Sequence, residues 1–102
     1  MYNILLVCNQ GMSTSFLVEK MKQAAQEKEK DVTIWAVSDA ELNENWEKAD
    51  IVLLGPQVSY LKSTAEKAVG NSIPIEVIDF LDYGRVNGEA VLDKALKSIN
   101  KD

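Results

Sequence analysis

The strongest constraint on the fold of this chain is the alternation of short apolar runs with longer amphipathic segments. The short, β-prone runs are residues 4–8, 32–37, 51–54 and 75–78. The longer segments carry apolar residues at helical spacing and span residues 13–29, 58–69 and 87–100. Ser38 and Glu41 stand at capping-box spacing, which predicts a short helix after the second run. Strands that alternate with helices predict an α/β fold with a parallel sheet, right-handed crossovers and helices on both faces.

We expect this four-stranded sheet to have the strand order 2-1-3-4, with the first strand central because its run is the most uniformly apolar. The short hydrophobic strands fit burial on both faces. No shift in composition, repeat or low-complexity linker divides the chain, so residues 1–102 are expected to form a single domain. Ligands of such folds bind beyond the carboxyl ends of the strands, beside the first strand. Cys8 is at that place.

Charge and composition exclude several classes of function. With 11 Lys and Arg against 16 Asp and Glu, the net charge of −5 repels phosphate backbones, so we expect no nucleic-acid partner. The chain has no histidine, which excludes an imidazole base, a histidine zinc ligand and a phosphohistidine on this protein. A single cysteine excludes an intrachain disulfide, a Cys-x-x-Cys redox pair and a thiolate metal cluster. We therefore expect neither a metal nor another cofactor.

The beginning of the chain does not have the pattern of a signal peptide, since no basic residue precedes its apolar run. No apolar stretch approaches the roughly 20 residues that a membrane-spanning helix needs. We expect a cytoplasmic protein in which Cys8 is a reduced thiol.

The segment after the first strand carries the candidate chemistry. Its residues are mostly small or hydroxylated, with one glycine that lets the backbone turn: Cys8, Asn9, Gln10, Gly11, Met12, Ser13, Thr14 and Ser15. A turn of this kind before a helix directs backbone N–H groups inward and predicts a phosphate-binding loop. The helix dipole also favours the thiolate, so Cys8 is predicted to attack phosphorus and to hold the product as a phosphocysteine.

A plainer interpretation of these residues stays open. Most free cysteines are small buried hydrophobic residues, and Ser13, Thr14 and Ser15 could serve only as helix caps. The place of Cys8 in the expected fold favours the functional interpretation.

Four further residues are candidates for loop support or for docking a partner. Gln57 follows Gly-Pro at the end of the third strand and could contact the loop or a docked protein. Asp79 follows the fourth strand and could orient loop groups, act as a general acid or cap the next segment. Tyr60 and Tyr83 are expected to pack against the loops, or else to line the docking surface.

Three segments taken together resemble a known family. They are Cys8 with residues 11–15, residues 53–57 with Tyr60, and residues 76–79 with Tyr83 and Gly84. Over essentially its whole length, the chain resembles the IIB subunit of the lactose/cellobiose class of the bacterial sugar phosphotransferase system, and in particular the cellobiose type.

The resemblance implies a phosphoryl relay. A phosphohistidine of a partner IIA protein gives its phosphoryl group to Cys8, and phospho-Cys8 gives it to a sugar bound by the membrane permease IIC. Such a protein is a phosphotransferase, a monomer in isolation, and meets the membrane only transiently through IIC. The surface that meets IIA and IIC must then surround Cys8. Cellobiose is the expected sugar, with lactose and chitobiose-type sugars as alternatives.

The resemblance also implies the fold of the low-molecular-weight tyrosine phosphatases, with an informative difference. Those enzymes have an arginine in the loop where this chain has Thr14, and they have an aspartate acid from a later loop. Between Cys8 and Lys20 this chain has no Lys or Arg. Without a cationic clamp and a leaving-group acid, transfer between partners is favoured over hydrolysis. The alternatives are a cysteine phosphatase or arsenate-reductase-like enzyme, and a non-catalytic phosphate-state sensor that would tolerate Cys8→Ala.

Overall fold

The fold is built on a four-stranded parallel sheet. The computed structural model describes residues 2–8, 12–70 and 72–100, with the backbone alone for residues 12 and 13. The strands are β1 Tyr2–Cys8, β2 Val32–Ser38, β3 Ile51–Leu54 and β4 Ile75–Val77. Their order is β2-β1-β3-β4, and every neighbouring pair is parallel. This confirms the order expected from the sequence, with the first strand inside the sheet.

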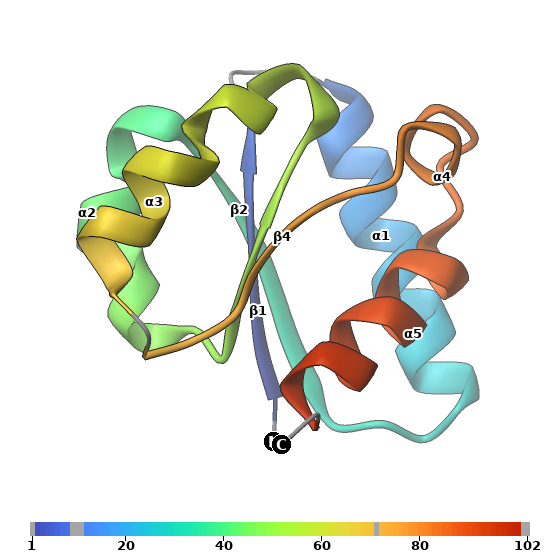
Figure 1. Ribbon diagram of the computed structural model, residues 1–102. Helices are drawn as coiled ribbons and strands as arrows, with labels where there is room; N and C mark the ends of the chain where they lie inside the picture. The colour runs from blue at the N-terminus through green and yellow to red at the C-terminus, as the bar shows by residue number, and fades with distance from the viewer. Residues whose placement is uncertain (1, 9–11, 71, 101–102) are drawn as a thin grey trace.

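Helices cover both faces of the sheet, as predicted. The α-helices are α1 Met12–Glu27, α2 Leu42–Asn45, α3 Lys62–Val69, α4 Phe80–Gly84 and α5 Gly88–Ile99. Short 3-10 helices accompany them, namely η1 Asp39–Glu41, η2 Trp46–Lys48 and η3 Pro56–Leu61. Figure 1 shows α1, α4 and α5 on one face, here called the α1–α5 face, and α2 and α3 on the other, the α2–α3 face. In the part of the chain that the structure describes, no helix combines the length and the apolar character needed to cross a membrane.

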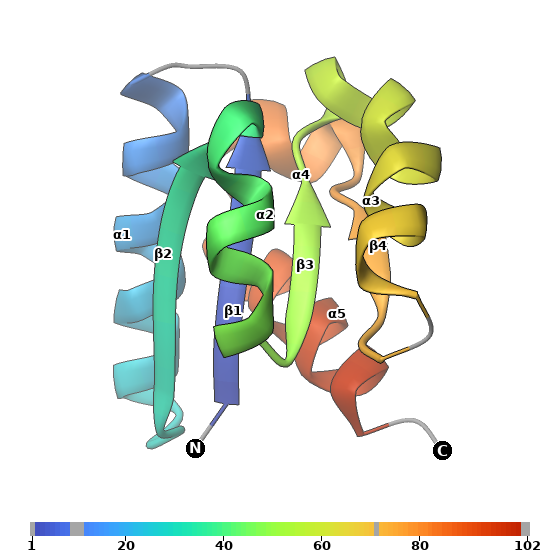
Figure 2. The ribbon, with the colours of Figure 1, turned by 90° about the vertical axis from the view of Figure 1, so that its left-hand side faces the viewer.

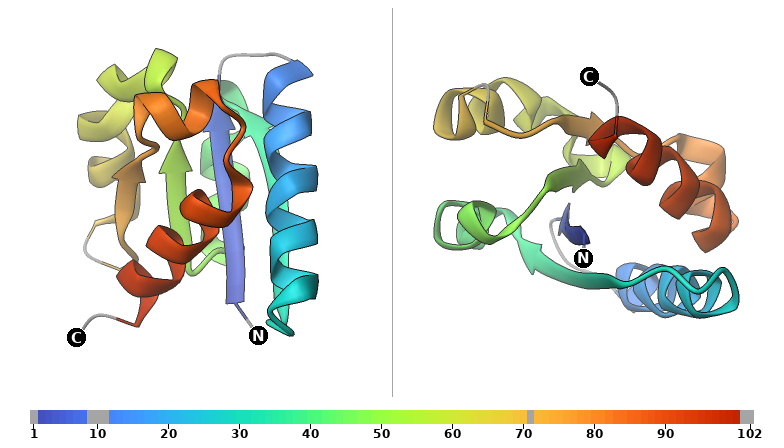
Figure 3. Two further views of the ribbon diagram at one scale, coloured as in Figure 1. Left: turned by 90° about the vertical axis from the view of Figure 1, so that its right-hand side faces the viewer. Right: turned by 90° about the horizontal axis from the view of Figure 1, so that it is seen from below.

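Alternation of side chains along β1 divides the core into two clusters. Ile4 and Leu6 belong to the cluster on the α1–α5 face, whereas Leu5 and Val7 belong to the cluster on the α2–α3 face. These four side chains are at most 1% exposed. The view from below in Figure 3 shows the sheet lying between the two helical layers. The expected burial on both faces is therefore confirmed for β1, and it is also observed for β3.

The expectation of burial on both faces is wrong for the two edge strands. In β4 only Ile75 is buried, and in β2 only Ile34 is buried. An edge strand has a neighbour on one side only, so part of its surface stays in contact with solvent.

Two segments differ from the helices that the sequence predicts. The predicted helix 58–69 begins as the 3-10 helix η3, where Val58 has a non-helical backbone (φ −117°, ψ 27°) and a fully buried side chain, and regular α-helix starts only at Lys62. The change follows from Pro56, which fixes the start of the segment, and from the burial of Val58 in the core. The helix α4 was not predicted, because five residues are too few to show helical periodicity.

The capping box expected at Ser38 is present. The Glu41 carboxylate accepts hydrogen bonds from the Ser38 backbone N–H at 3.3 Å and from the Ser38 hydroxyl at 3.0 Å. The short helical segment after β2 therefore starts where the sequence places it.

The helices α1 and α5 approach each other closely at one point. A Cβ atom added at Gly88 would lie 2.4 Å from the backbone carbonyl carbon of Lys20, a distance that only glycine avoids. Nearby, Lys28 at the end of α1 forms ion pairs with Glu89 at 3.3 Å and with Asp93 at 3.1 Å in α5. Figure 3 (left) shows the two helices side by side on this face.

The beginning of β1 and the end of α5 lie together at the amino edge of the sheet. The Tyr2 hydroxyl donates a hydrogen bond of 3.0 Å to the side-chain oxygen of Asn100. The last residue of β1, Cys8, is therefore at the opposite edge of the sheet from this contact.

Candidate active site

Cys8 is the last residue of β1 and lies at the carboxyl edge of the sheet, where its backbone is level with Ser38 of β2. Two residues after Leu6, its side chain points toward the α1–α5 face by the same alternation. The residue is 6% exposed. Figure 2 shows the first turn of α1 at the same end of the sheet as the arrowhead of β1. The thiol therefore stands near the amino end of a 16-residue helix, the end at which the helix dipole favours negative charge.

The sulfur of Cys8 contacts a buried hydroxyl rather than hydrocarbon alone. Its Sγ atom lies 2.9 Å from the hydroxyl oxygen of Thr14, in the first turn of α1. The same Thr14 oxygen lies 3.0 Å from the hydroxyl oxygen of Tyr83 in α4. Thr14 is 3% exposed and Tyr83 9% exposed, so the three side chains form a row of polar atoms covered by protein. The interpretation of Cys8 as only a buried hydrophobic residue does not account for this row.

The short helix α4 holds Tyr83 in place. Its N-cap is Asp79, whose carboxylate accepts hydrogen bonds from the backbone N–H groups of Leu81 at 3.1 Å and Asp82 at 3.2 Å. The Lys94 ammonium of α5 donates a hydrogen bond of 2.8 Å to Asp82, and this bond is the main reason that the pKa of Lys94 is raised above its ordinary value of 10.5. Of the three roles considered for Asp79, its hydrogen bonds fit the helix cap.

Gly55 and Gln57 lie beside Cys8 at the end of β3. The Gly55 N–H donates to the Val7 carbonyl at 2.9 Å, which continues the sheet by one residue. A Cβ atom added at Gly55 would lie 3.5 Å from Cys8 Cβ and 3.1 Å from the Gln57 side-chain oxygen. The Gln57 amide therefore folds back toward the strand end that carries the thiol.

A groove opens between η3 and α4. It has a volume of about 390 Å³ and is lined by Pro56, Gln57, Phe80, Tyr83, Gly84 and Val86. Tyr83 thus reaches from the groove wall to the buried Thr14 hydroxyl. Val86, at the end of this segment, has a φ of +53°, a left-handed conformation that is unusual for a β-branched residue.

The carboxyl edge of the sheet also carries exposed apolar side chains. Among the described residues, the large hydrophobic side chains that are exposed are Phe16 of α1, Tyr60 of η3, Val77 at the end of β4, and Phe80 and Leu81 of α4. We call these five residues the apolar rim. Each of them lies on an element that begins or ends at the edge where Cys8 stands.

The structure describes only some of the site residues that the sequence predicts. Asn9, Gln10 and Gly11 lie outside the described residues, as do the side chains of Met12 and Ser13. Ser15 is exposed, and the buried Tyr83 contacts the Thr14 hydroxyl. The expectation that Tyr60 packs against the loops is wrong, because this side chain is 70% exposed on η3 and only the docking alternative stays open for it.

Sequence reasoning missed the contact between Thr14 and Tyr83, which are 69 positions apart. A usable signal was present, because Cys8 alternates with the same period as Ile4 and Leu6. Its side chain therefore lies on the face covered by α1, whose first turn includes Thr14. In the described ranges, no group of His, Cys, Asp or Glu side chains is arranged to hold a metal ion.

Comparison with known proteins places the chain among similar sequences over nearly its whole length. The family model described as "PTS system, Lactose/Cellobiose specific IIB subunit" matches residues 3–94. The oligo-beta-mannoside-specific EIIB component of Bacillus subtilis (strain 168) is 46% identical over 97 residues, covering 94% of each chain. The cellobiose-specific EIIB component of Lactococcus lactis subsp. lactis (strain IL1403) is 42% identical over 103 residues, covering 95% of each chain.

Solved structures that resemble this chain are also IIB components of the sugar phosphotransferase system. The solution structure of a cellobiose-specific phosphotransferase IIB component from Borrelia burgdorferi superposes with a TM-score of 0.81 at 43% identity, covering 97% of this chain and 92% of that one. The lactose-specific IIB component domain from Streptococcus pneumoniae gives a TM-score of 0.85 at 16% identity, covering 95% and 96%, and so shows the shared fold.

Proposed function

Because the chain belongs to the lactose/cellobiose-specific IIB family of the sugar phosphotransferase system, we propose that Cys8 is the residue that carries its phosphoryl group. Members of this family are phosphotransferases that act together with IIA and IIC components. In the proposed cycle, a phosphohistidine of IIA donates the phosphoryl group to Cys8. Phospho-Cys8 then passes it to a cellobiose-type disaccharide held by the membrane permease IIC.

The observation that carries this proposal is the sulfur of the single cysteine, held against a hydroxyl at the amino end of α1. In the first step the thiolate attacks phosphorus, an S–P bond forms and the N–P bond of the phosphohistidine breaks. In the second step a sugar hydroxyl attacks phosphorus, an O–P bond forms and the thiolate leaves with the electron pair of the S–P bond. Both steps need positioning and charge stabilisation more than covalent help from other side chains.

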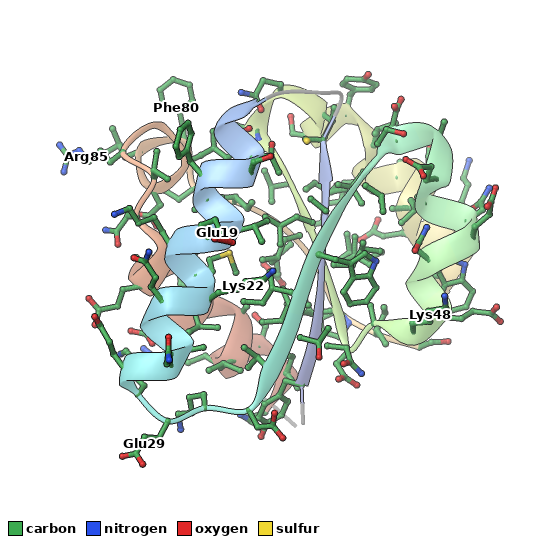
Figure 4. The ribbon with its side chains drawn as sticks, turned by 180° about the vertical axis from the view of Figure 1, so that it is seen from behind. Glu19, Lys22, Glu29, Lys48, Phe80 and Arg85 are labelled. Carbon is green, nitrogen blue, oxygen red and sulfur yellow. The ribbon has the colours of Figure 1, made fainter. Side chains whose placement is uncertain are left out.

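The surroundings of the thiol favour transfer over hydrolysis. Cys8 is 6% exposed, which limits the approach of water. The sequence from Asn9 to Glu19 contains no Lys or Arg, and Figure 4 shows Arg85 pointing outward at the end of α4. A phosphatase needs a cationic clamp and a leaving-group acid for rapid attack by water. The phosphatase alternative is therefore not favoured.

The apolar rim around Cys8 is the surface we propose for docking IIA and IIC. Isolated exposed apolar residues are common, but a set gathered at one edge of a sheet is typical of a protein-binding surface. Both partners must reach the same sulfur, so they take turns on this surface. The protein is then a monomer in the cytoplasm that meets the membrane only while it is bound to IIC.

The names of the relatives bear on the sugar of this system. Their names refer to oligo-beta-mannoside, galactose and cellobiose. We propose cellobiose because both a curated relative and a solved structure of more than 40% identity are named as cellobiose-specific. Phosphorylation of cellobiose, lactose and chitobiose by membranes that contain IIC tests this choice.

The experiment that tests the phosphocarrier role is intact-protein mass spectrometry after incubation with phosphorylated IIA. The expected result is one added phosphoryl group on Cys8, absent in Cys8→Ser. No added phosphoryl group on the parent protein would end the proposal. The sensor alternative predicts instead that the Cys8→Ala variant binds its partner as tightly as the parent protein does.

A further inference from the structure

We propose that the Thr14 and Tyr83 hydroxyls form a relay that donates a hydrogen bond to the Cys8 sulfur whenever this sulfur carries negative charge. Thr14 touches the reacting atom and is in this sense a catalytic residue, whereas Tyr83 acts through Thr14 and is a positioning residue. The proposal rests on the phosphocarrier role of Cys8 and adds the groups that stabilise its thiolate.

The geometry puts the three polar atoms in a row, with the Thr14 hydroxyl between the sulfur and the Tyr83 hydroxyl. Cys8 Sγ lies 2.9 Å from Thr14 Oγ1, and Thr14 Oγ1 lies 3.0 Å from Tyr83 Oη. Among the described residues, Thr14 and Tyr83 are the buried residues whose side chains carry a polar oxygen or nitrogen atom. No buried side-chain nitrogen or oxygen atom of the described residues lacks a hydrogen-bond partner. A threonine at a helix start is ordinarily an exposed cap, so its burial against a thiol calls for another reason.

The charge of the sulfur fixes the direction of the hydrogen bonds. A neutral thiol can donate to Thr14, and Thr14 can then donate to Tyr83. A thiolate can only accept, so the single proton of the Thr14 hydroxyl must point to the sulfur. The Thr14 oxygen is then free to accept from Tyr83, whose hydroxyl becomes the donor. Loss of the thiol proton thus turns both hydroxyls toward Cys8.

The relay acts in both steps of the proposed cycle because the thiolate occurs in both. Before the first step it favours the ionised form, which is the attacking nucleophile. In the second step the same form is the leaving group, and a donor already aimed at the sulfur stabilises the charge that develops there. A neutral hydroxyl stabilises negative charge less than an arginine does. This weaker stabilisation suits Cys8, which must pass the phosphoryl group on rather than hold it.

Among the described residues, the charged groups near the relay are either bound elsewhere or exposed. In η3, residues 56–61 include no acidic or basic residue. In α4, the Asp79 carboxylate accepts from the helix backbone and the Asp82 carboxylate accepts from Lys94. In η1, the Glu41 carboxylate is bound to Ser38, and Asp39 is exposed. The first turn of α1 has no acidic residue.

The test is the rate at which iodoacetamide alkylates Cys8 as a function of pH, because this reagent reacts with the thiolate. The variant Thr14→Val keeps the shape of the side chain and removes the hydroxyl, and we expect alkylation to slow about tenfold near pH 7. The difference should become smaller as the pH is raised, because the relay acts only on how readily the thiolate forms. The variant Tyr83→Phe, in which Thr14 still donates, should slow alkylation about threefold near pH 7.

Three control variants separate the relay from packing. Thr14→Ser keeps the hydroxyl and should restore the rate to within about twofold of the parent. Thr64→Val makes the same exchange at an exposed position of α3, and Tyr2→Phe removes a tyrosine hydroxyl at the far end of β1. Both should alkylate like the parent at every pH. Circular dichroism checks that each variant is folded, and Tyr83→Phe carries the test if Thr14→Val does not fold.

Two outcomes would overturn the relay. One is a rate that falls by the same factor at all pH values in Thr14→Val and Tyr83→Phe, since this would assign a steric role to these side chains. The other is a pH profile in both variants equal to that of the parent. Either result leaves the phosphocarrier role intact if the parent protein still gains a phosphoryl group on Cys8. The absence of that group would instead remove the proposed function itself.

Discussion

The two faces of the sheet are built in different ways. On the α1–α5 face, two long helices of 16 and 12 residues pack against the sheet and against each other. On the α2–α3 face, the longest helix has eight residues, and the rest is short 3-10 and α segments. Of the described residues, sixteen are buried in the first cluster and ten in the second. The Thr14 and Tyr83 hydroxyls both come from the more regular face.

The difference indicates where this fold needs rigidity. Helices shorter than about 12 residues are marginal by themselves, so the segments of the α2–α3 face depend on their contacts with the sheet. The relay beside Cys8 requires distances fixed to a few tenths of an ångström. Thr14 comes from the long helix α1, and Tyr83 comes from the five-residue α4, which the ion pair of Asp82 with Lys94 joins to the long helix α5. The α2–α3 face contributes Gly55 and Gln57, which lie near the thiol at the end of β3.

The largest test of this comparison is truncation of one leucine on each face. Leu17 of α1 is 0% exposed and Leu42 of α2 is 5% exposed. Because the regular face can relax less around a cavity, we expect Leu17→Ala to lower the free energy of unfolding by about 3–5 kcal/mol and Leu42→Ala by about 2–3 kcal/mol. Urea unfolding with unchanged m-values measures both. Equal losses, or a larger loss for Leu42→Ala, would break the comparison.

A smaller loss is expected at the close approach of α1 and α5. An added Cβ at Gly88 meets the backbone of Lys20 and Met21, which cannot move without shifting a helix. We expect Gly88→Ala to cost about 2–3 kcal/mol, measured by thermal or urea unfolding. The matched control is Gly84→Ala, where a Cβ meets nothing within 4 Å and stability should change by no more than about 0.5 kcal/mol. A neutral Gly88→Ala would mean that the two helices are not held as closely as their backbones indicate.

The smallest effect concerns the ion pairs of Lys28, just after α1, with α5. The hydrogen bond of Lys28 with Asp93, followed by that with Glu89, raises the pKa of Lys28 above its ordinary value of 10.5. A pKa raised by folding gives stability that is complete below that ordinary value and is lost as the pH rises through the higher value of the folded protein. The stability advantage of the parent over Lys28→Gln should therefore be small at pH 8 to 9 and shrink further above pH 10.5, in urea unfolding series.

The control for this series is Lys22→Gln, since Lys22 lies on the exposed side of α1 (Figure 4) and forms no ion pair with the described residues. Its stability relative to the parent should not depend on pH in the same range. An advantage of the parent over Lys28→Gln that grows with pH would contradict the role of these ion pairs.

The parts of the molecule that the sequence predicts are those with a local pattern. The four apolar runs predict the strands and their order, and helical periodicity predicts α1 and α5. The three segments around Cys8, Tyr60 and Tyr83 correctly indicated the family. The place of Cys8 at the carboxyl edge follows from the topology alone.

The parts that the sequence does not predict depend on contacts between distant residues. The five-residue helix α4 has too little periodicity to be recognised, yet its Asp79 cap decides where Tyr83 points. The 3-10 start of η3 results from burying Val58, which no local pattern shows. The Thr14–Tyr83 contact joins two elements through the whole fold, and the exposure of Tyr60 depends on how η3 lies on the sheet.

The hydrogen bond between Tyr2 and Asn100 has a practical consequence for engineering the protein. It brings the first strand and the last helix together at the edge of the sheet remote from Cys8. A fluorescent tag, a surface anchor or a second module attached at either end would therefore leave the thiol accessible to other proteins. A short linker between the two ends would also permit circular permutation, with new termini opened in an exposed connection such as residues 29–31 between α1 and β2.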